Sequence, residues 1–195
     1  VVIPFRALSR LMIRSGDTSQ RRYTMPKAIE KTTVAALQLF IIVLTPKGGV
    51  GKSLLACLLA AFLARLNRMP NFVSVDARHP SRRLIERLGI PVISADLPSG
   101  DKMSADRYAV MRAFAPVEEA LAASAGRADI VLDIGSPGSR TAFEYIIRSE
   151  LADRLREAGY QPVVLVPATA QFEALALAAE TLKLARDCFG DAVIT

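Results

Sequence analysis

The sequence predicts an α/β protein with a doubly wound, mostly parallel sheet flanked by helices, and three observations support this. From residue 39 onward, short apolar runs alternate with longer helical stretches. The apolar runs are continuous and do not alternate with polar residues, which is typical of strands covered on both faces of a parallel sheet. A glycine-rich segment joins the first apolar run to the first helical stretch. Together these features favour a layered sheet over a helical bundle or a β-sandwich.

Each expected strand is an apolar run bounded by polar or turn-forming residues. The five expected strands are Leu39–Thr45, Phe72–Asp76, Ile130–Ile134, Pro162–Pro167 and Ala192–Thr195. Residues 89–103 contain proline and glycine and receive no assignment. Because a strand is only beginning at residue 192, we expect the natural chain to continue beyond Thr195.

Helical stretches are expected between the strands, at residues 53–67, 81–88, 104–125, 139–158 and 170–188. The stretch after Ser53 is apolar nearly all round, which predicts a helix buried beside the sheet. In the stretch 139–158, Phe143, Ile147, Leu151 and Leu155 lie four residues apart, which predicts one amphipathic helix.

Composition bounds the class of protein. The chain has 195 residues, 51% of them hydrophobic and 23% charged, which excludes a largely disordered chain and allows a full core. Its apolar stretches are shorter than the ~20 residues that a membrane-spanning helix needs. Cys57 and Cys188 lie far apart and belong to no metal-binding cluster, which indicates a reducing compartment. We therefore expect a cytoplasmic protein whose body, residues 25–195, is one domain.

Residues 1–24 differ from this body. They carry five arginines against Asp17 alone, whereas residues 25–195 are close to charge balance within the net charge of +6. The favoured interpretation is a basic extension that is disordered or lies upstream of a true start at Met25. Alternatives are a basic amphipathic targeting or membrane-surface helix, or a segment that contacts DNA. The near-balanced body itself supports neither a membrane nor a nucleic-acid partner.

The glycine-rich segment carries the chemistry. It is Thr-Pro-Lys-Gly-Gly-Val-Gly-Lys-Ser, residues 45–53. Glycines allow a tight turn in which successive backbone N–H groups face phosphate oxygens, at a helix N-terminus that favours negative charge. Lys52 is placed to reach the β- and γ-phosphates, and the Ser53 hydroxyl to bind Mg²⁺. The predicted nucleotide-binding residues are Lys47, Gly48, Gly49, Val50, Gly51, Lys52, Ser53 and Leu54.

Two other interpretations of this loop are weaker. A plain glycine-rich turn requires neither Lys52 nor Ser53. A dinucleotide-binding loop requires a third glycine or alanine where Leu54 stands. The sequence therefore predicts a mononucleotide phosphate loop.

The loop departs from the usual G-x-x-x-x-G-K-[ST] pattern, because Pro46 replaces the first glycine and Lys47 adds a second lysine. The pattern K-G-G-x-G-K-[ST] resembles the deviant Walker A loop of the ParA/MinD family of P-loop ATPases, and the resemblance extends over residues 39–195. It implies a P-loop NTPase fold, ATP with Mg²⁺, and an ATP-dependent homodimer in which Lys47 reaches the partner's phosphates. A regulatory protein partner is also implied. The alternative for Lys47 is a solvated loop charge.

This family serves plasmid or chromosome partition, cell-division positioning and conjugative transfer, and the sequence does not choose among these processes. The resemblance implies a Mg²⁺-dependent ATPase that acts as a dimerisation switch. Its catalytic residues would be Lys47, Lys52, Asp76 and Asp133.

Two of these residues are aspartates at strand ends. Asp133 follows an apolar run, and a carboxylate there orients Mg²⁺ in the Walker B arrangement. The alternative is that Asp133 caps the following helix. The segment after it resembles the family's switch II.

Asp76 ends a second strand, 24 residues after Lys52, at the position that resembles switch I. The family pattern there is D-x-D, but Arg78 stands at the second acidic position. This departure raises the alternative of a nucleotide-binding module with weak or no hydrolysis. His79 is expected in a surface loop, and Arg82, Arg83 and Arg87 form a solvated helix face or contact a phosphate or a partner.

Overall fold

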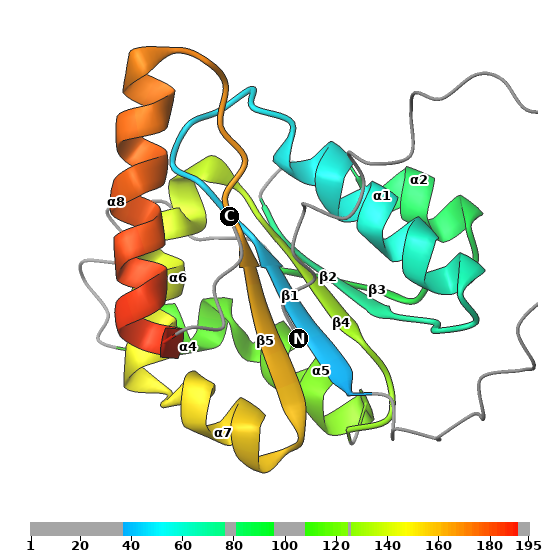
Figure 1. The fold of residues 1–195 in the computed structure, drawn as a ribbon. Helices are drawn as coiled ribbons and strands as arrows, with labels where there is room; N and C mark the ends of the chain where they lie inside the picture. Colours follow the sequence, from blue (N-terminus) through cyan, green and yellow to red (C-terminus); the bar gives the residue numbers. More distant parts are fainter. Residues whose placement is uncertain (1–36, 77–80, 96–107, 125, 191–195) are drawn as a thin grey trace, which may run out of the picture. The chain divides into compact units, whose positions relative to one another are not determined.

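The computed structural model describes residues 37–76, 81–95, 108–124 and 126–190, which belong to one compact unit, Val34–Thr195. The expectations for residues 1–24, for Arg78 and His79, and for a strand at Ala192–Thr195 lie outside the described residues. Within them the chain forms a five-stranded sheet in which every pairing is parallel, with the strand order β3-β2-β4-β1-β5 (Figure 1). The predicted doubly wound α/β fold is thereby confirmed.

The strands are β1 (Gln38–Val43), β2 (Asn71–Val75), β3 (Val92–Ala95), β4 (Ile130–Ile134) and β5 (Tyr160–Leu165). The helices are α1 (Lys52–Arg65), α2 (Arg82–Arg87), α4 (Ala109–Ala113), α5 (Ala115–Ser124), α6 (Ser139–Arg148), α7 (Leu151–Glu157) and α8 (Phe172–Phe189), with a 3₁₀ turn, η2, at Ser136–Gly138.

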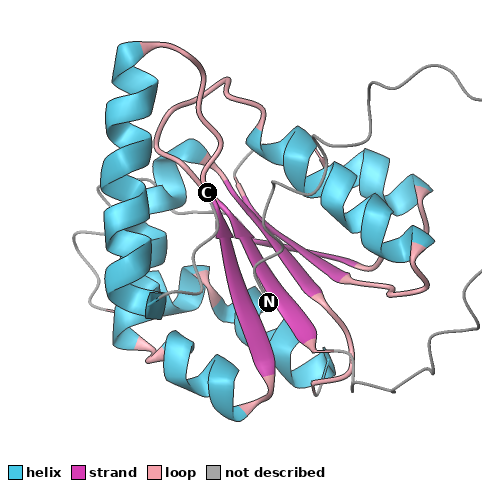
Figure 2. Ribbon diagram, in the orientation of Figure 1, coloured by secondary structure: helices cyan, strands magenta, loops and turns pink. Residues whose placement is uncertain are grey.

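Helices cover both faces of the sheet (Figure 2). Helices α1 and α2 lie on one face, and α4 to α8 lie on the other (Figure 1). Successive β1 residues point to opposite faces, so Ile41 and Val43 join the core under α1, whereas Phe40 and Ile42 join the core on the other side. A strand buried in this way on both faces needs a continuous apolar run, which is what the sequence of β1 provides.

Two expected helices are each divided in two. The stretch 139–158 breaks between α6 and α7, because Glu150 adopts a left-handed conformation with φ of 51°. Ile147 is therefore 63% exposed although its expected partners on the same face are buried. The stretch 104–125 breaks at Phe114, and Pro116 sits in the first turn of α5, where its missing N–H removes no helical hydrogen bond.

Two further expectations need correction. Strand β3 lies within residues 89–103, which received no assignment; it is a short, half-buried edge strand without a continuous apolar run. Helix α1 is buried on one side only, since Leu54, Leu58 and Phe62 are each about 60% exposed. Among the described helices, none is long and apolar enough to cross a bilayer.

Candidate functional site

The carboxyl ends of β1, β4 and β2 lie level at one edge of the sheet. Val43 pairs with Asp133, and Ser74 pairs with the same Asp133 from the other side. Residues 44–51 run from this edge into α1. Gly49 and Gly51 have φ values of 75° and 87°, a left-handed region where L-residues are strained, so the path of the loop requires glycine there. Gly51 is the N-cap of α1, which places the positive end of that helix at the loop.

Lys52 turns back across this loop. Its side chain donates hydrogen bonds from Nζ to the Lys47 carbonyl oxygen at 2.9 Å and to Ser136 Oγ at 2.7 Å. Burial lowers the pKa of Lys52, and the negative charges of Asp133 and Asp76 oppose that shift. Lys52 is 7% exposed and borders a cavity of about 240 Å³. The cavity is lined by Gly49, Gly51, Lys52, Ser53, Leu54, Asp76 and Ser136.

Asp133 is 1% exposed and does not line the cavity, but it interacts electrostatically with Lys52 and Asp76, which do. It accepts hydrogen bonds from the hydroxyls of Ser81, at 3.2 Å, and of Ser53. Burial raises the pKa of Asp133 above its usual range, against the opposing effect of those two hydroxyls. The alternative in which Asp133 caps the next helix is wrong, because Gly138 is the N-cap of α6 and Asp133 is a residue of β4.

The donor set at Asp133 fits a hydrated Mg²⁺. The Oδ1 atom of Asp133 is buried and has no hydrogen-bond partner, and the same holds for Thr45 Oγ1 at the start of the loop. An unpartnered carboxylate oxygen beside a serine hydroxyl is the kind of oxygen ligand that Mg²⁺ takes. No cluster of three or more His, Cys, Asp or Glu side chains that could hold a metal occurs in the described part of the chain. Phosphate oxygens or water would therefore have to complete the coordination.

Asp76 and Gly135 bring the segments after β2 and β4 into contact. The Gly135 N–H donates to the Val75 carbonyl oxygen at 3.0 Å. A Cβ atom at position 135 would lie 2.6 Å from Asp76 Oδ2 and 3.0 Å from Asp76 Cβ. A larger residue at position 135 would force the Asp76 side chain or one of the two backbones to move, so the position of the Asp76 carboxylate depends directly on residue 135.

Lys47 forms an ion pair within its own chain. Its Nζ atom lies 2.6 Å from Oε2 of Glu173 in the first turn of α8. The two side chains are 30% and 71% exposed, so the pair is open to water. The structure thus places Lys47 next to the loop with its ammonium directed toward α8.

The structure brings Lys52, Ser53, Asp76 and Asp133 to one edge of the sheet, as the order of strands and motifs predicted. Sequence reasoning missed three further residues of this site. They are Ser81, which donates to Asp133; Ser136, which accepts from Lys52; and Glu173, which pairs with Lys47. Ser136 lies in the segment identified as resembling switch II, which was the one available signal.

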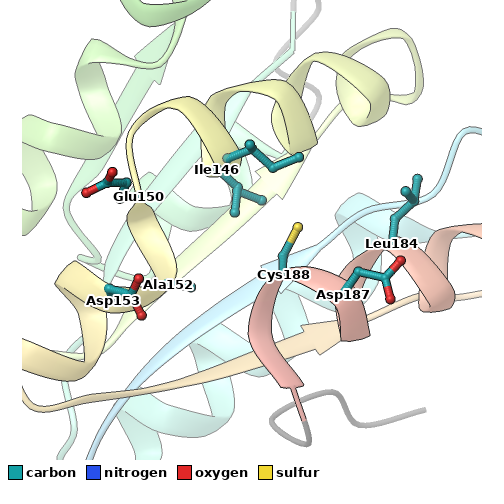
Figure 3. A pocket seen from close by; sticks show the side chains of 8 residues that line it. Ile146, Glu150, Ala152, Asp153, Leu184, Asp187 and Cys188 are labelled. Atoms are coloured by element: carbon teal, nitrogen blue, oxygen red, sulfur yellow. The ribbon is translucent and has the colours of Figure 1, made fainter.

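A second cavity, of about 360 Å³, lies between α8 and the α6–α7 corner (Figure 3). Its apolar lining is bordered by the carboxylates of Glu150, Asp153 and Asp187. It is larger than the cavity beside Lys52 but contains none of the predicted site residues, so volume alone does not identify the functional site.

Comparison with known proteins adds the following. No protein-family model matches the sequence, and no curated protein matches it. Among solved structures, the chain is similar to the signal recognition particle receptor FtsY from Elizabethkingia anophelis, with 15% identity, coverage of 79% of this chain and 48% of that chain, and a TM-score of 0.48. It is also similar to FtsY from Mycoplasma mycoides, with 16% identity, coverage of 77% and 50%, and a TM-score of 0.45. The chain spans about half the length of these two structures.

Proposed function

We propose that this chain binds ATP with Mg²⁺ at the loop 45–53 and hydrolyses it as a ParA/MinD-like dimerisation switch. The observation that carries the proposal is the meeting of opposite charges at one site. Lys52 and Asp76 line the same cavity at the start of α1, and the buried carboxylate of Asp133 interacts electrostatically with both. A polyphosphate supplies negative charge for the lysine and the helix N-terminus, and its metal ion supplies positive charge for Asp133.

Each residue of the loop then has a role. Gly49 and Gly51 shape the loop so that backbone N–H groups face the phosphates, and Lys52 exchanges its bond to Ser136 for a phosphate oxygen. Ser53 and the free Oδ1 atom of Asp133 hold Mg²⁺, which neutralises phosphate charge. Asp76, in contact with Gly135, would sense whether the γ-phosphate is present.

In the proposed switch, Lys47 acts on the nucleotide that is bound to a second subunit. In a homodimer with nucleotide between the subunits, Lys47 would leave Glu173 and reach the partner's phosphates. A regulatory protein would then recognise the ATP-bound dimer, in partition, division-site placement or conjugative transfer. The choice of ATP, the dimer and the process all come from the resemblance of the loop, and the ion pair of Lys47 with Glu173 is the contact that dimerisation must break.

Nucleotide binding is tested by calorimetry with ATP and with GTP, each with and without Mg²⁺. We expect Lys52→Ala to abolish ATP binding without unfolding the protein, because the side chain faces the cavity and not the apolar core. Lys183→Ala, on α8, is the matched control and should bind as the wild type does. Equal ATP affinity in the wild type and Lys52→Ala would reject the site, and a preference for GTP would reject ATP as the ligand.

Hydrolysis is tested separately, by Mg²⁺-dependent phosphate release at saturating ATP. Release that requires Lys52 supports the ATPase. ATP binding without release supports the alternative, a nucleotide-binding module, to which Arg78 at the second acidic position of switch I points.

A further inference from the structure

The outer side of α1 carries a row of exposed apolar side chains. Leu54, Leu58, Phe62 and Leu66 follow one another at intervals of four residues and are 61%, 59%, 59% and 53% exposed. The opposite side of the helix, with Ala56, Ala60 and Leu63 among its residues, packs on the sheet. The row therefore lies outside the core and exposes four large apolar groups to water, of which Leu54 also lines the cavity beside Lys52.

The neighbouring helix also exposes apolar side chains. Helix α2 packs beside α1 on the same face of the sheet (Figure 1), and its Leu84 and Leu88 are 47% and 45% exposed. Six of the thirteen large hydrophobic side chains exposed in the described part of the chain therefore lie on α1, α2 or the C-caps of these two helices. Such a concentration on one part of a protein surface marks an interaction site, whereas scattered exposed residues do not.

The charge on these two helices is positive. Helix α1 has no acidic residue, and Arg65, Arg83 and Arg87 are exposed and form no ion pair with any described residue. The one carboxylate on the two helices, Glu86, is already paired with Arg82 at 2.7 Å. An occupant of this surface therefore needs an apolar side and acidic residues beside it.

We propose that the outer surface of α1 and α2 is a docking site for an acidic amphipathic helix of a protein partner. Residues at intervals of four form one of the ridges along which helices pack, and a second helix fits its own side chains into the flanking grooves. From Leu54 to Leu66 the row extends over ~18 Å, three turns, which matches one helix of ordinary length. A second copy of this chain would present the same arginines and repel them, so we assign a different partner.

The probe is a synthetic 18-residue peptide with leucines on one helical face and glutamates on the other, labelled for fluorescence anisotropy and titrated with the full chain. We expect saturable binding that Phe62→Ser or Leu58→Gln weakens by about tenfold, as for central anchors of an interface. Leu175→Gln on α8 is the matched control, because Leu175 is 51% exposed on the other face of the sheet and should not affect binding.

Charge is tested in the same way. The double variant Arg83→Glu, Arg87→Glu should weaken binding of the acidic peptide, whereas Arg186→Glu on α8 should leave that binding unchanged. A peptide with lysines in place of the glutamates should bind weakly to the wild type. These comparisons separate the site from general attraction to a basic protein, since residues 1–24 are the same in every variant.

Three results would overturn the proposal: no saturable binding of the acidic peptide, equal losses in the α1 and α8 variants, or tighter binding of the lysine peptide. Sedimentation with vesicles of anionic lipid and measurement of self-association test the other occupants. If Phe62→Ser abolishes vesicle binding or self-association while peptide binding is unchanged, this surface belongs to a membrane or to a second copy. None of these measurements requires nucleotide, so their failure leaves the proposed ATP site unaffected.

Discussion

Replacing Gly135 with alanine tests whether the segments after β2 and β4 are mechanically coupled. The added Cβ would lie 2.6 Å from Oδ2 and 2.7 Å from Cγ of Asp76. Rotation of the Asp76 side chain moves these two atoms away, but it leaves Asp76 Cβ at 3.0 Å, a distance set by the two backbones. The hydrogen bond from Gly135 N–H to the Val75 carbonyl oxygen resists separation of those backbones.

The expected cost follows from two opposing effects. Overpacking of this kind costs ~1–3 kcal/mol. The backbone of Gly135, with φ of −58° and ψ of 151°, suits alanine, and loss of glycine's freedom in the unfolded chain returns ~0.4–1 kcal/mol. We therefore expect the free energy of unfolding to fall by ~1–2 kcal/mol, and Mg·ATP binding to weaken because Asp76 is displaced from the cavity.

Urea denaturation of four proteins measures the coupling: the wild type, Gly135→Ala, Asp76→Ala and the double variant. Removing the Asp76 carboxylate eliminates the two shortest contacts, so alanine at 135 should cost less in the Asp76→Ala background. An equal cost of Gly135→Ala in both backgrounds, or a stability equal to that of the wild type, would refute the proposed contact.

Three further predictions follow from the site. Burial raises the pKa of Asp133, so ionisation of this carboxyl destabilises the folded state as the pH rises above the ordinary value of 3.8. Asp133→Asn should therefore increase the free energy of unfolding at pH 7 and lose that advantage in acid. The same variant should remove the Mg²⁺ dependence of ATP affinity. A wild-type response to Mg²⁺ would contradict the metal role. Glu173→Gln should change the free energy of unfolding by less than ~1 kcal/mol, because the ion pair of Glu173 with Lys47 is exposed. The variant should nevertheless form more ATP-dependent dimer, measured by sedimentation velocity. An unchanged dimer fraction would show that the ion pair does not compete with dimerisation. Arg78→Asp should raise single-turnover hydrolysis, by up to ~10²–10⁴-fold if a water-positioning carboxylate is restored, with little change in ATP affinity; an unchanged rate would end the lost-catalysis alternative.

The fold could be predicted where burial is two-sided. Strand β4 begins and ends where the sequence placed it, and β1 differs by one or two residues. Both lie in the middle of the sheet and are apolar along their length, apart from Gln38 at the start of β1 and Asp133 near the end of β4. Strand β3 escaped prediction because an edge strand of four half-buried residues needs no such run. The helix break at Glu150 could not be predicted either. Glycine in a sequence signals a possible left-handed backbone conformation, whereas glutamate, which adopts that conformation here, does not.

Some residues of the candidate site could be predicted from the sequence and others could not. Lys52 and Ser53 could be predicted because spacing within one loop defines them, and Asp76 and Asp133 because parallel strands bring their carboxyl ends to a common edge. Ser81, Ser136 and Glu173 could not, because each is defined by a contact across 52 to 126 residues of sequence and none belongs to a local pattern. Serine and glutamate are common in loops and helix starts, so their types alone carried no signal.

Proline in β5 affects how the edge of the sheet meets other chains. Strand β5 is the last in the order of described strands, and its Leu165 carbonyl oxygen accepts from Leu44 N–H, which orients residue 165 toward β1. Backbone groups alternate along a strand, so Tyr160, Pro162 and Val164 direct theirs outward. Pro162 has no N–H, and an incoming strand would meet a missing donor at the centre of this edge. The same proline costs nothing on the β1 side, so Pro162 disfavours addition of another chain's strand to this side of β5 without weakening the pairing of β5 with β1.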